Sequence, residues 1–102
     1  MIVVVGEVRF GAGEIDRLKP DFAKAIAATR AEDGCNHYAY SVDLEDPGLL
    51  HVSERWRDLE ALDEHMVAPH MADLGTILHA AKIEAISIKA YEANYVKTLL
   101  GA

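Results

Sequence analysis

The chain has 102 residues, of which 51% are hydrophobic and 26% charged, a balance typical of one folded domain and far from that of a disordered chain. Its net charge of −7, with no unneutralised cluster of lysine and arginine, disfavours binding to nucleic acid or to an anionic membrane surface. A single cysteine, Cys35, excludes an internal disulfide, and without a basic leader or a long apolar run we expect a cytoplasmic protein.

The first third of the chain predicts a strand followed by a helix. Residues 2–10 alternate apolar and polar side chains, which is the period of a half-buried strand. Residues 15–29 carry apolar side chains three or four apart, as an amphipathic helix does. Because proline lacks an N–H and disfavours α conformation in the preceding residue, we expect regular helix only from Pro20 onward. Gly34 is expected to cap the helix at its C-terminal end.

The middle of the chain predicts an antiparallel hairpin. Residues 35–44 and 49–57 each place apolar or aromatic side chains at every second position, as two strands do. Pro47 and Gly48 lie between them and suit the two central positions of a type II turn, in which glycine adopts a positive φ.

A helix with a break and a last strand complete the predicted elements. Asp58 is a suitable N-cap for a helix whose apolar pattern is interrupted at Pro69 and then resumes. Residues 82–92 predict the last strand, and residues 93–102 form an apolar tail.

The element order βαββαβ predicts an α+β ferredoxin-like sandwich, an antiparallel sheet with both helices on one side. We expect a single domain over residues 1–102, with its core in residues 2–92. The helices leave the other face of the sheet without a cover, and this predicts a homodimer in which two sheets pack together.

The segment Glu54–His70 reads E-x-W-x-D-x-x-A-L-x-x-H-x-x-x-P-H and resembles the antibiotic biosynthesis monooxygenase domain family. The sequence Glu32-Asp33-Gly34-Cys35 and the hairpin turn agree with that family, so the resemblance extends over residues 2–92. It implies a dimeric α+β barrel and, as in several members, a monooxygenase that needs neither metal nor flavin and acts on quinols or polyketide-like phenols. Haem-degrading relatives carry an asparagine where this chain has Val8, which disfavours that activity.

Three residues are candidates for catalysis. Oxygenation without a cofactor requires an electron-rich substrate anion, and histidine is a suitable base because its ordinary pKa is near 6.5. His65 or His70 would be this base, although each also has a structural interpretation, in helix docking or in capping the helix break. Glu54 lies on the inward face of its strand and would orient a histidine, or would pair with Arg9 or with a partner subunit.

Three residues are candidates for substrate binding. Trp56 would form a pocket wall, or would be an ordinary core residue. Tyr38 would direct its hydroxyl at a bound phenol, or would pack across the strands, and Asn36 is a weaker candidate. No metal site is expected, since His65 and His70 are five residues apart rather than four and no third ligand is evident.

The leading hypothesis is a cofactor-independent monooxygenase that uses O₂ on a small aromatic, quinol or polyketide-like substrate, in a pocket between the sheet and the second helix. Two alternatives remain open at this point. One is a dimeric module that binds a small ligand without converting it, and the other is an isomerase or tautomerase of the same fold.

Overall fold

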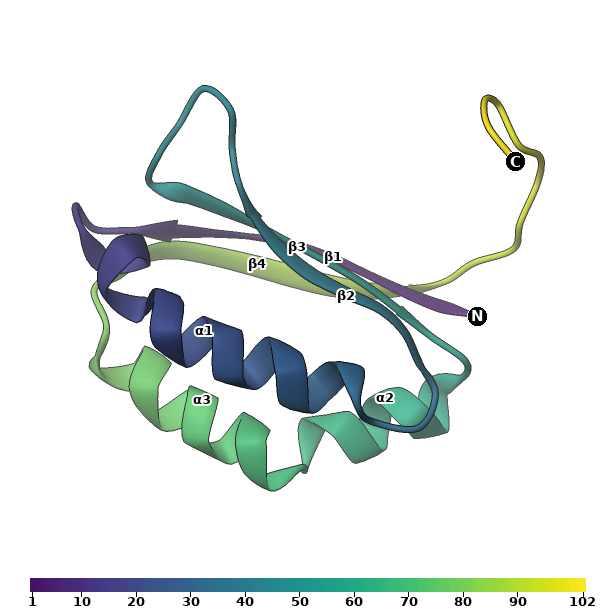
Figure 1. Cartoon of the computed structure of the whole chain (residues 1–102), viewed down its shortest axis with the longest axis horizontal. Helices are drawn as coiled ribbons and strands as arrows, with labels where there is room; N and C mark the ends of the chain where they lie inside the picture. Colours follow the sequence, from purple (N-terminus) through teal and green to yellow (C-terminus); the bar gives the residue numbers. More distant parts are fainter.

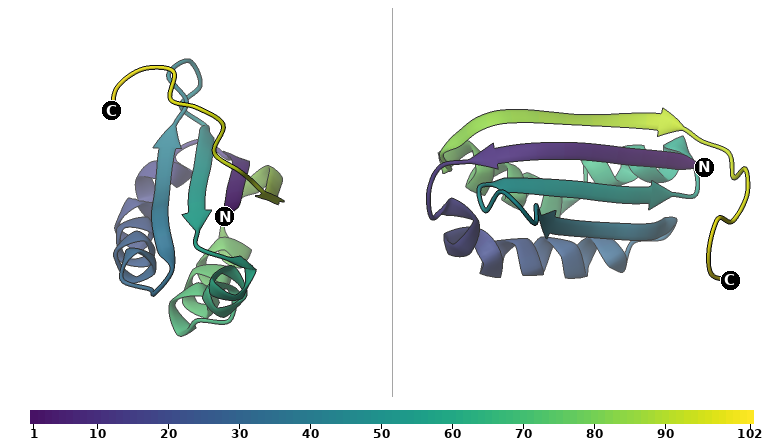
Figure 2. Two further views of the ribbon diagram at one scale, coloured as in Figure 1. Left: turned by 90° about the vertical axis from the view of Figure 1, so that its right-hand side faces the viewer. Right: turned by 90° about the horizontal axis from the view of Figure 1, so that it is seen from above.

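The computed structural model describes all 102 residues and consists of two layers, a four-stranded sheet and three helices on one of its faces (Figures 1 and 2). The elements are β1 (Ile2–Phe10), α1 (Glu14–Arg30), β2 (Cys35–Val42), β3 (Leu49–Trp56), α2 (Leu59–Met66), α3 (Pro69–Ala80) and β4 (Ile83–Glu92). The strand order is β2-β3-β1-β4, and every neighbouring pair is antiparallel. The predicted α+β ferredoxin-like sandwich is therefore confirmed.

The hydrophobic core lies between the helices and the inner face of the sheet, and it divides into two clusters. The cluster beside α2 consists of Ile2, Val4, Tyr38, Trp56, Ala61 and Leu62. The other cluster joins α1 and α3 to the far end of the sheet and consists of Val8, Phe10, Ile15, Leu18, Phe22, Ala25, Leu50 and Leu74. Period-two alternation explains both clusters, because it sends every second strand residue to the helix side.

The start of α1 differs from the expectation, because regular helix begins at Glu14 and continues through Pro20. Ile15 and Leu18, which precede the proline, are both buried against the sheet, and Leu18 has no exposed surface. Burying these side chains offsets the roughly 3 kcal/mol that a proline inside a helix costs. Gly34 is also not the C-cap, since the helix ends at Arg30 and Gly34 adopts its positive φ of 83° only in the turn that follows.

The hairpin between β2 and β3 forms as predicted, but its turn is not of type II. Gly48 does not adopt a positive φ, although Leu49 N–H still donates to Asp46 O across the turn at 3.2 Å. The Asp46 side chain decides the geometry, because its Oδ1 accepts the Gly48 N–H at 3.0 Å while Oδ2 pairs with Arg9 at 2.8 Å. Such a bond from an aspartate to the backbone two residues later is an alternative way to hold a turn.

The predicted break in the second helix is confirmed, and it divides that helix into α2 and α3. Ala68 has an extended backbone with ψ of 147°, as expected for a residue that precedes proline, and Pro69 begins α3. Asp58 caps α2 by accepting the Ala61 N–H at 2.8 Å. The break changes the direction of the chain between His65 and His70, and this determines how the two imidazoles meet.

The outer face of the sheet has no helix over it (Figure 2). This face is not a continuous apolar surface, because the exposed Val5 and Tyr91 alternate with charged side chains such as Glu7 and Lys89. Homodimer formation therefore stays a prediction, which sedimentation at micromolar concentration will measure. None of the helices combines the length and the apolar character that crossing a membrane requires.

The contacts of the Glu14 carboxylate predict that the free energy of unfolding decreases in acid. Its carboxylate accepts hydrogen bonds from the Arg17 side chain at 2.7 and 2.8 Å and from the Lys82 backbone N–H at 2.9 Å, so it joins the start of α1 to the start of β4. These bonds, with that from Arg17 the larger cause, lower the pKa of Glu14 from 4.5 to about 2. The stabilisation is present above the unfolded pKa and disappears as the pH falls through the folded pKa.

We therefore expect the free energy of unfolding to fall as the pH decreases from about 5 to about 2, and Glu14→Gln to show a weaker dependence over that range. Urea unfolding at a series of pH values measures this. Glu64→Gln is the matched control, because Glu64 is an exposed helical glutamate that makes no ion pair. An equal pH dependence in the wild type and Glu14→Gln would contradict the prediction.

Candidate active site

Local packing at the end of α1 brings an acidic residue against α2. Gly34 lies so close to this helix that a Cβ built on it would be 2.6 Å from the Ala61 Cβ. Its carbonyl accepts the Arg57 N–H at 2.8 Å, and Arg57 also pairs with Asp33 at 3.2 Å. These contacts hold the turn after α1 against the first turn of α2. His65 lies one helical turn beyond Ala61, on the same face, and Glu32 of the α1–β2 turn is beside it.

Glu32, His65 and His70 form a hydrogen-bonded cluster. One carboxylate oxygen, Oε2 of Glu32, lies 2.6 Å from Nδ1 of His65 and 2.9 Å from Nε2 of His70. An ionised carboxylate only accepts hydrogen bonds, so these two ring nitrogens donate. In a neutral imidazole this leaves Nδ1 of His70 and Nε2 of His65 free to accept a proton. The break before Pro69 allows both rings to reach the same oxygen.

The two histidines differ in their access to solvent. The His65 side chain is 1% exposed and lies between aromatic rings, with the Trp56 ring centroid at 4.6 Å and the Tyr38 ring centroid at 5.5 Å. The His70 side chain is 24% exposed and that of Glu32 is 18% exposed. His65 is therefore held rigidly inside the protein, whereas His70 is the member of the pair that a small molecule can reach.

Glu54 faces inward as expected, but within the chain its hydrogen-bond partner is neither Arg9 nor a histidine, and pairing with a partner subunit stays a prediction. Its Oε1 accepts the Trp56 indole N–H at 2.9 Å. Arg9 cannot reach it, because Arg9 alternates to the outer face of the sheet and pairs with Asp46. His65 bonds Glu32 instead, through its Nδ1. Burial raises the pKa of the Glu54 carboxyl, and the indole hydrogen bond partly opposes this shift.

The other predicted binding residues occupy different positions. Tyr38 is 2% exposed, and its hydroxyl lies 2.6 Å from that of Tyr40. Burial is the main cause that raises the pKa of both phenols. Asn36 lies at an irregularity in the pairing of β2 with β3, is exposed and makes no side-chain hydrogen bond to His65 or His70. The structure thus brings Tyr38, Trp56 and Glu54 together around His65 and leaves Asn36 outside.

A groove of about 230 Å³ lies beside His70, between α1 and α3. The remaining residues that line it are Asp21, Lys24, Ala25, Ala28, Asp73, Leu74 and Ile77. None of the larger pockets is lined by His65, in the space between the sheet and α2 where a pocket was expected. Tight packing by Trp56, which has no exposed surface, fills this space.

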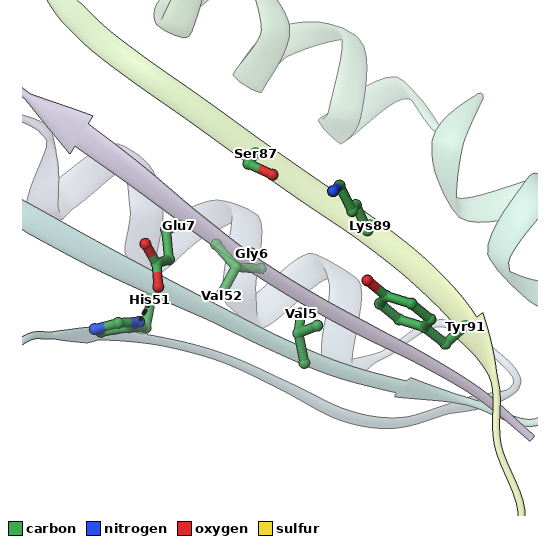
Figure 3. A pocket seen from close by; sticks show the side chains of 8 residues that line it. All are labelled: Val5, Gly6, Glu7, His51, Val52, Ser87, Lys89 and Tyr91. Atoms are coloured by element: carbon green, nitrogen blue, oxygen red, sulfur yellow. Dashed lines mark ion pairs between the residues drawn. The ribbon is translucent and has the colours of Figure 1, made fainter.

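A larger hollow of about 460 Å³ lies on the opposite, outer face of the sheet (Figure 3). His51 lies at one end of it, paired with Asp43 at 2.8 Å and 3.9 Å from Glu7, and Tyr91 lies at the other end. His51 thus lies on the face of the sheet opposite to Trp56. The hollow is separated from the histidine pair by the sheet itself.

Glu32 is the residue that sequence reasoning missed. The prediction that there is no metal site rested on the five-residue spacing of His65 and His70 and on the lack of a third ligand in the sequence. The structure contradicts this argument, because Glu32 supplies a third donor and the ligand atoms of all three residues lie within 4.8 Å of one another. Two features of the sequence could have identified Glu32. It follows the first helix closely, and it belongs to the segment Glu32-Asp33-Gly34-Cys35 that agrees with the family.

Comparison with known proteins relates this site to a family. A profile described as antibiotic biosynthesis monooxygenase matches residues 1–75. "Probable quinol monooxygenase YgiN" of Escherichia coli is 30% identical over 81 residues, which cover 70% of this chain and 78% of that protein. "Putative monooxygenase Rv0793" of Mycobacterium tuberculosis is 49% identical over 45 residues, or 44% of each chain.

A solved structure from Deinococcus radiodurans, titled as that of "a putative antibiotic biosynthesis monooxygenase", superposes with a TM-score of 0.91. It is 30% identical to this chain, and the superposition covers 99% of this chain and all of that one. The profile match extends from β1 into the first half of α3, and it therefore includes every member of the site: Glu32, Tyr38, Glu54, Trp56, His65 and His70. This chain belongs to the antibiotic biosynthesis monooxygenase family.

Proposed function

We propose that the protein is a cofactor-independent monooxygenase that acts on a small aromatic or quinol-like substrate bound beside His70. The observation that carries this proposal is the shared Glu32 carboxylate, which orients an accessible histidine at the edge of a groove. The family and the relative named as a quinol monooxygenase support the same reaction class.

In this proposal His70 is the base. Its Nε2 donates to Glu32, so Nδ1 is available to take the proton of a phenolic hydroxyl. The carboxylate then stabilises the imidazolium that forms, as the acid of a catalytic triad does. His65 is a positioning residue, because it is buried and binds the same oxygen of Glu32. Trp56 and Glu54 hold His65 in place indirectly. The indole packs against the His65 ring, and the indole N–H donates to Glu54.

The groove favours a small, flat substrate. Its volume of about 230 Å³ is below the roughly 300 to 1,000 Å³ of pockets for drug-sized ligands, which suits a molecule of one or two rings. Ala25, Leu74 and Ile77 supply apolar surface for the ring. Lys24 also lines the groove, where its ammonium would attract a phenolate against the opposing charges of Asp21 and Asp73.

The reaction balances without a separate reductant. Deprotonation gives an electron-rich anion that passes electrons to O₂, and combination of the resulting radicals forms a carbon–oxygen bond. Loss of water from the hydroperoxide leaves an oxidised, hydroxylated quinone. One oxygen atom enters the product, the other leaves as water, and the substrate supplies all four electrons. The protein contributes the base, the orientation of the ring and a partly dry groove.

The test uses chelator-treated protein with a panel of hydroquinones and naphthols under air. We expect O₂ uptake above the buffer rate for at least one compound, with one product molecule formed for each O₂ consumed, a hydroxylated quinone from a hydroquinone or a naphthoquinone from a naphthol. Isotopically labelled ¹⁸O₂ should appear as one labelled atom in the product. No uptake above the buffer rate across the panel would refute the proposal, and product formed equally without oxygen would indicate an isomerase or tautomerase instead.

A further inference from the structure

We propose that Glu32, His65 and His70 also bind one first-row divalent transition metal ion of the Zn²⁺ or Ni²⁺ type. The donor set consists of two imidazole nitrogens and one carboxylate oxygen, and these atoms lie within 4.8 Å of one another. The same combination, with further positions left to water or substrate, occurs in catalytic zinc sites and in non-haem iron enzymes.

The three donors need only small side-chain movements to surround an ion. Bonds of about 2.0 to 2.2 Å in a tetrahedral site place ligand atoms roughly 3.4 Å apart. Oε2 of Glu32 is now 2.6 Å from His65 Nδ1 and 2.9 Å from His70 Nε2, as expected for hydrogen bonds. Insertion of the ion separates these pairs by less than an ångström, and the two nitrogens move closer together.

Each donor is held by a different part of the fold. Glu32 is fixed by its backbone, whose N–H donates to Thr29 O at 3.0 Å and whose carbonyl accepts the Cys35 N–H at 3.3 Å. His65 is held between the rings of Trp56 and Tyr38. His70 stands in the first turn of α3, which begins at the helix break. Such support from surrounding groups fixes ligand orientation and strengthens metal binding.

The site is open on one side only. His65 is completely enclosed, whereas Glu32 and His70 are 18% and 24% exposed at their side chains. The groove between α1 and α3 reaches His70 and gives an ion a route from solvent. Water can therefore complete the coordination, as it does in zinc sites with three protein ligands.

The choice of ion follows from the ligands. Imidazole nitrogens suit Zn²⁺, Ni²⁺, Co²⁺ and Cu²⁺, while Mg²⁺ and Ca²⁺ prefer six or more oxygen ligands. A single carboxylate oxygen cannot meet that demand. The chain charge of −7 also favours the approach of a cation.

Metal binding and base catalysis use different tautomers of the same rings. The ion takes Nδ1 of His65 and Nε2 of His70, which carry the protons when Glu32 bridges the two histidines. An occupied site thus removes the carboxylate bridge that activates His70. Binding itself requires neither substrate nor O₂, so it is measured independently of the proposed oxygenation.

The single tryptophan of the chain is a built-in reporter for this site. Trp56 stacks on His65 with ring centroids 4.6 Å apart, so a paramagnetic ion bound at His65 should quench its fluorescence strongly. The experiment titrates purified, chelator-treated protein with Ni²⁺ while recording tryptophan emission, and uses calorimetry with Zn²⁺ to count ions. We expect saturable quenching, one ion per chain, competition by Zn²⁺ and no effect of Mg²⁺.

Glu32→Gln and His70→Gln should each weaken Ni²⁺ binding at least about tenfold, with circular dichroism used to confirm that both variants fold. His51→Ala is the matched control, because His51 has two acidic neighbours on the opposite face of the sheet and should bind no ion that affects Trp56. Absence of quenching by Ni²⁺ would overturn the proposal. Quenching that is unchanged in both variants, or is lost in His51→Ala, would overturn it as well.

Discussion

Trp56→Ala is expected to lower the free energy of unfolding by about 3 to 5 kcal/mol, the range for removing a large aromatic side chain from a packed core. Trp56 has no exposed surface and lies in the cluster that joins β1, β2 and β3 to α2. Its loss leaves a cavity beside His65 and removes the stacking contact that holds the imidazole.

The same substitution also removes the hydrogen bond to Glu54. This carboxyl is 6% exposed and accepts the indole N–H at 2.9 Å, so in the variant a buried acceptor lacks its donor. An unsatisfied buried polar group costs about 1 to 3 kcal/mol. Trp56→Phe removes the N–H and keeps one aromatic ring in the core, so it leaves a smaller cavity than Trp56→Ala.

Urea unfolding followed by circular dichroism measures both variants. Tyr95→Ala is the matched control, since Tyr95 is 73% exposed in the segment after β4 and should change stability little. We expect Trp56→Phe to lie between the wild type and Trp56→Ala. A loss below about 1 kcal/mol in Trp56→Ala would show that the core does not depend on this side chain.

His70→Ala is expected to reduce the rate of O₂ uptake by a factor of about 10² to 10⁴, the usual contribution of a positioned general base. Glu32→Gln should lower kcat in the same direction, because glutamine cannot stabilise an imidazolium by charge. Chelator-treated proteins are compared with the best substrate from the panel, so that any bound ion does not contribute.

His79→Ala is the control for this prediction. His79 lies on the same helix as His70, is exposed in the last turn, and makes no contact with Glu32. Its replacement should leave kcat unchanged. Uptake that is equal in the wild type and His70→Ala would exclude His70 as the base, and a dominant effect of His65→Ala would assign that role to the buried ring.

Local sequence features predicted most of the architecture. Alternation placed Val4, Val8 and Phe10 on the inner face of β1, as the structure confirms, because a strand has a fixed period of two. Pro69 marked the division of the second helix, since proline disfavours helical conformation in the preceding residue. The predicted start of α1 near Pro20 was wrong. The local preference of proline was outweighed by tertiary packing, because burial of Leu18 stabilises the helical turn before Pro20.

The sequence by itself determined the element order, the buried faces and the aromatic and histidine residues that mark the family. Only the tertiary structure decided the composition of the site. Glu32 is 33 residues from His65 and 38 from His70, and no pattern over such separations states which atoms meet. Close packing of Gly34 on Ala61 brings them together, and of the two histidines only His70 is accessible to solvent. Contacts of this kind depend on how the helices and sheet dock, which local periodicity does not contain.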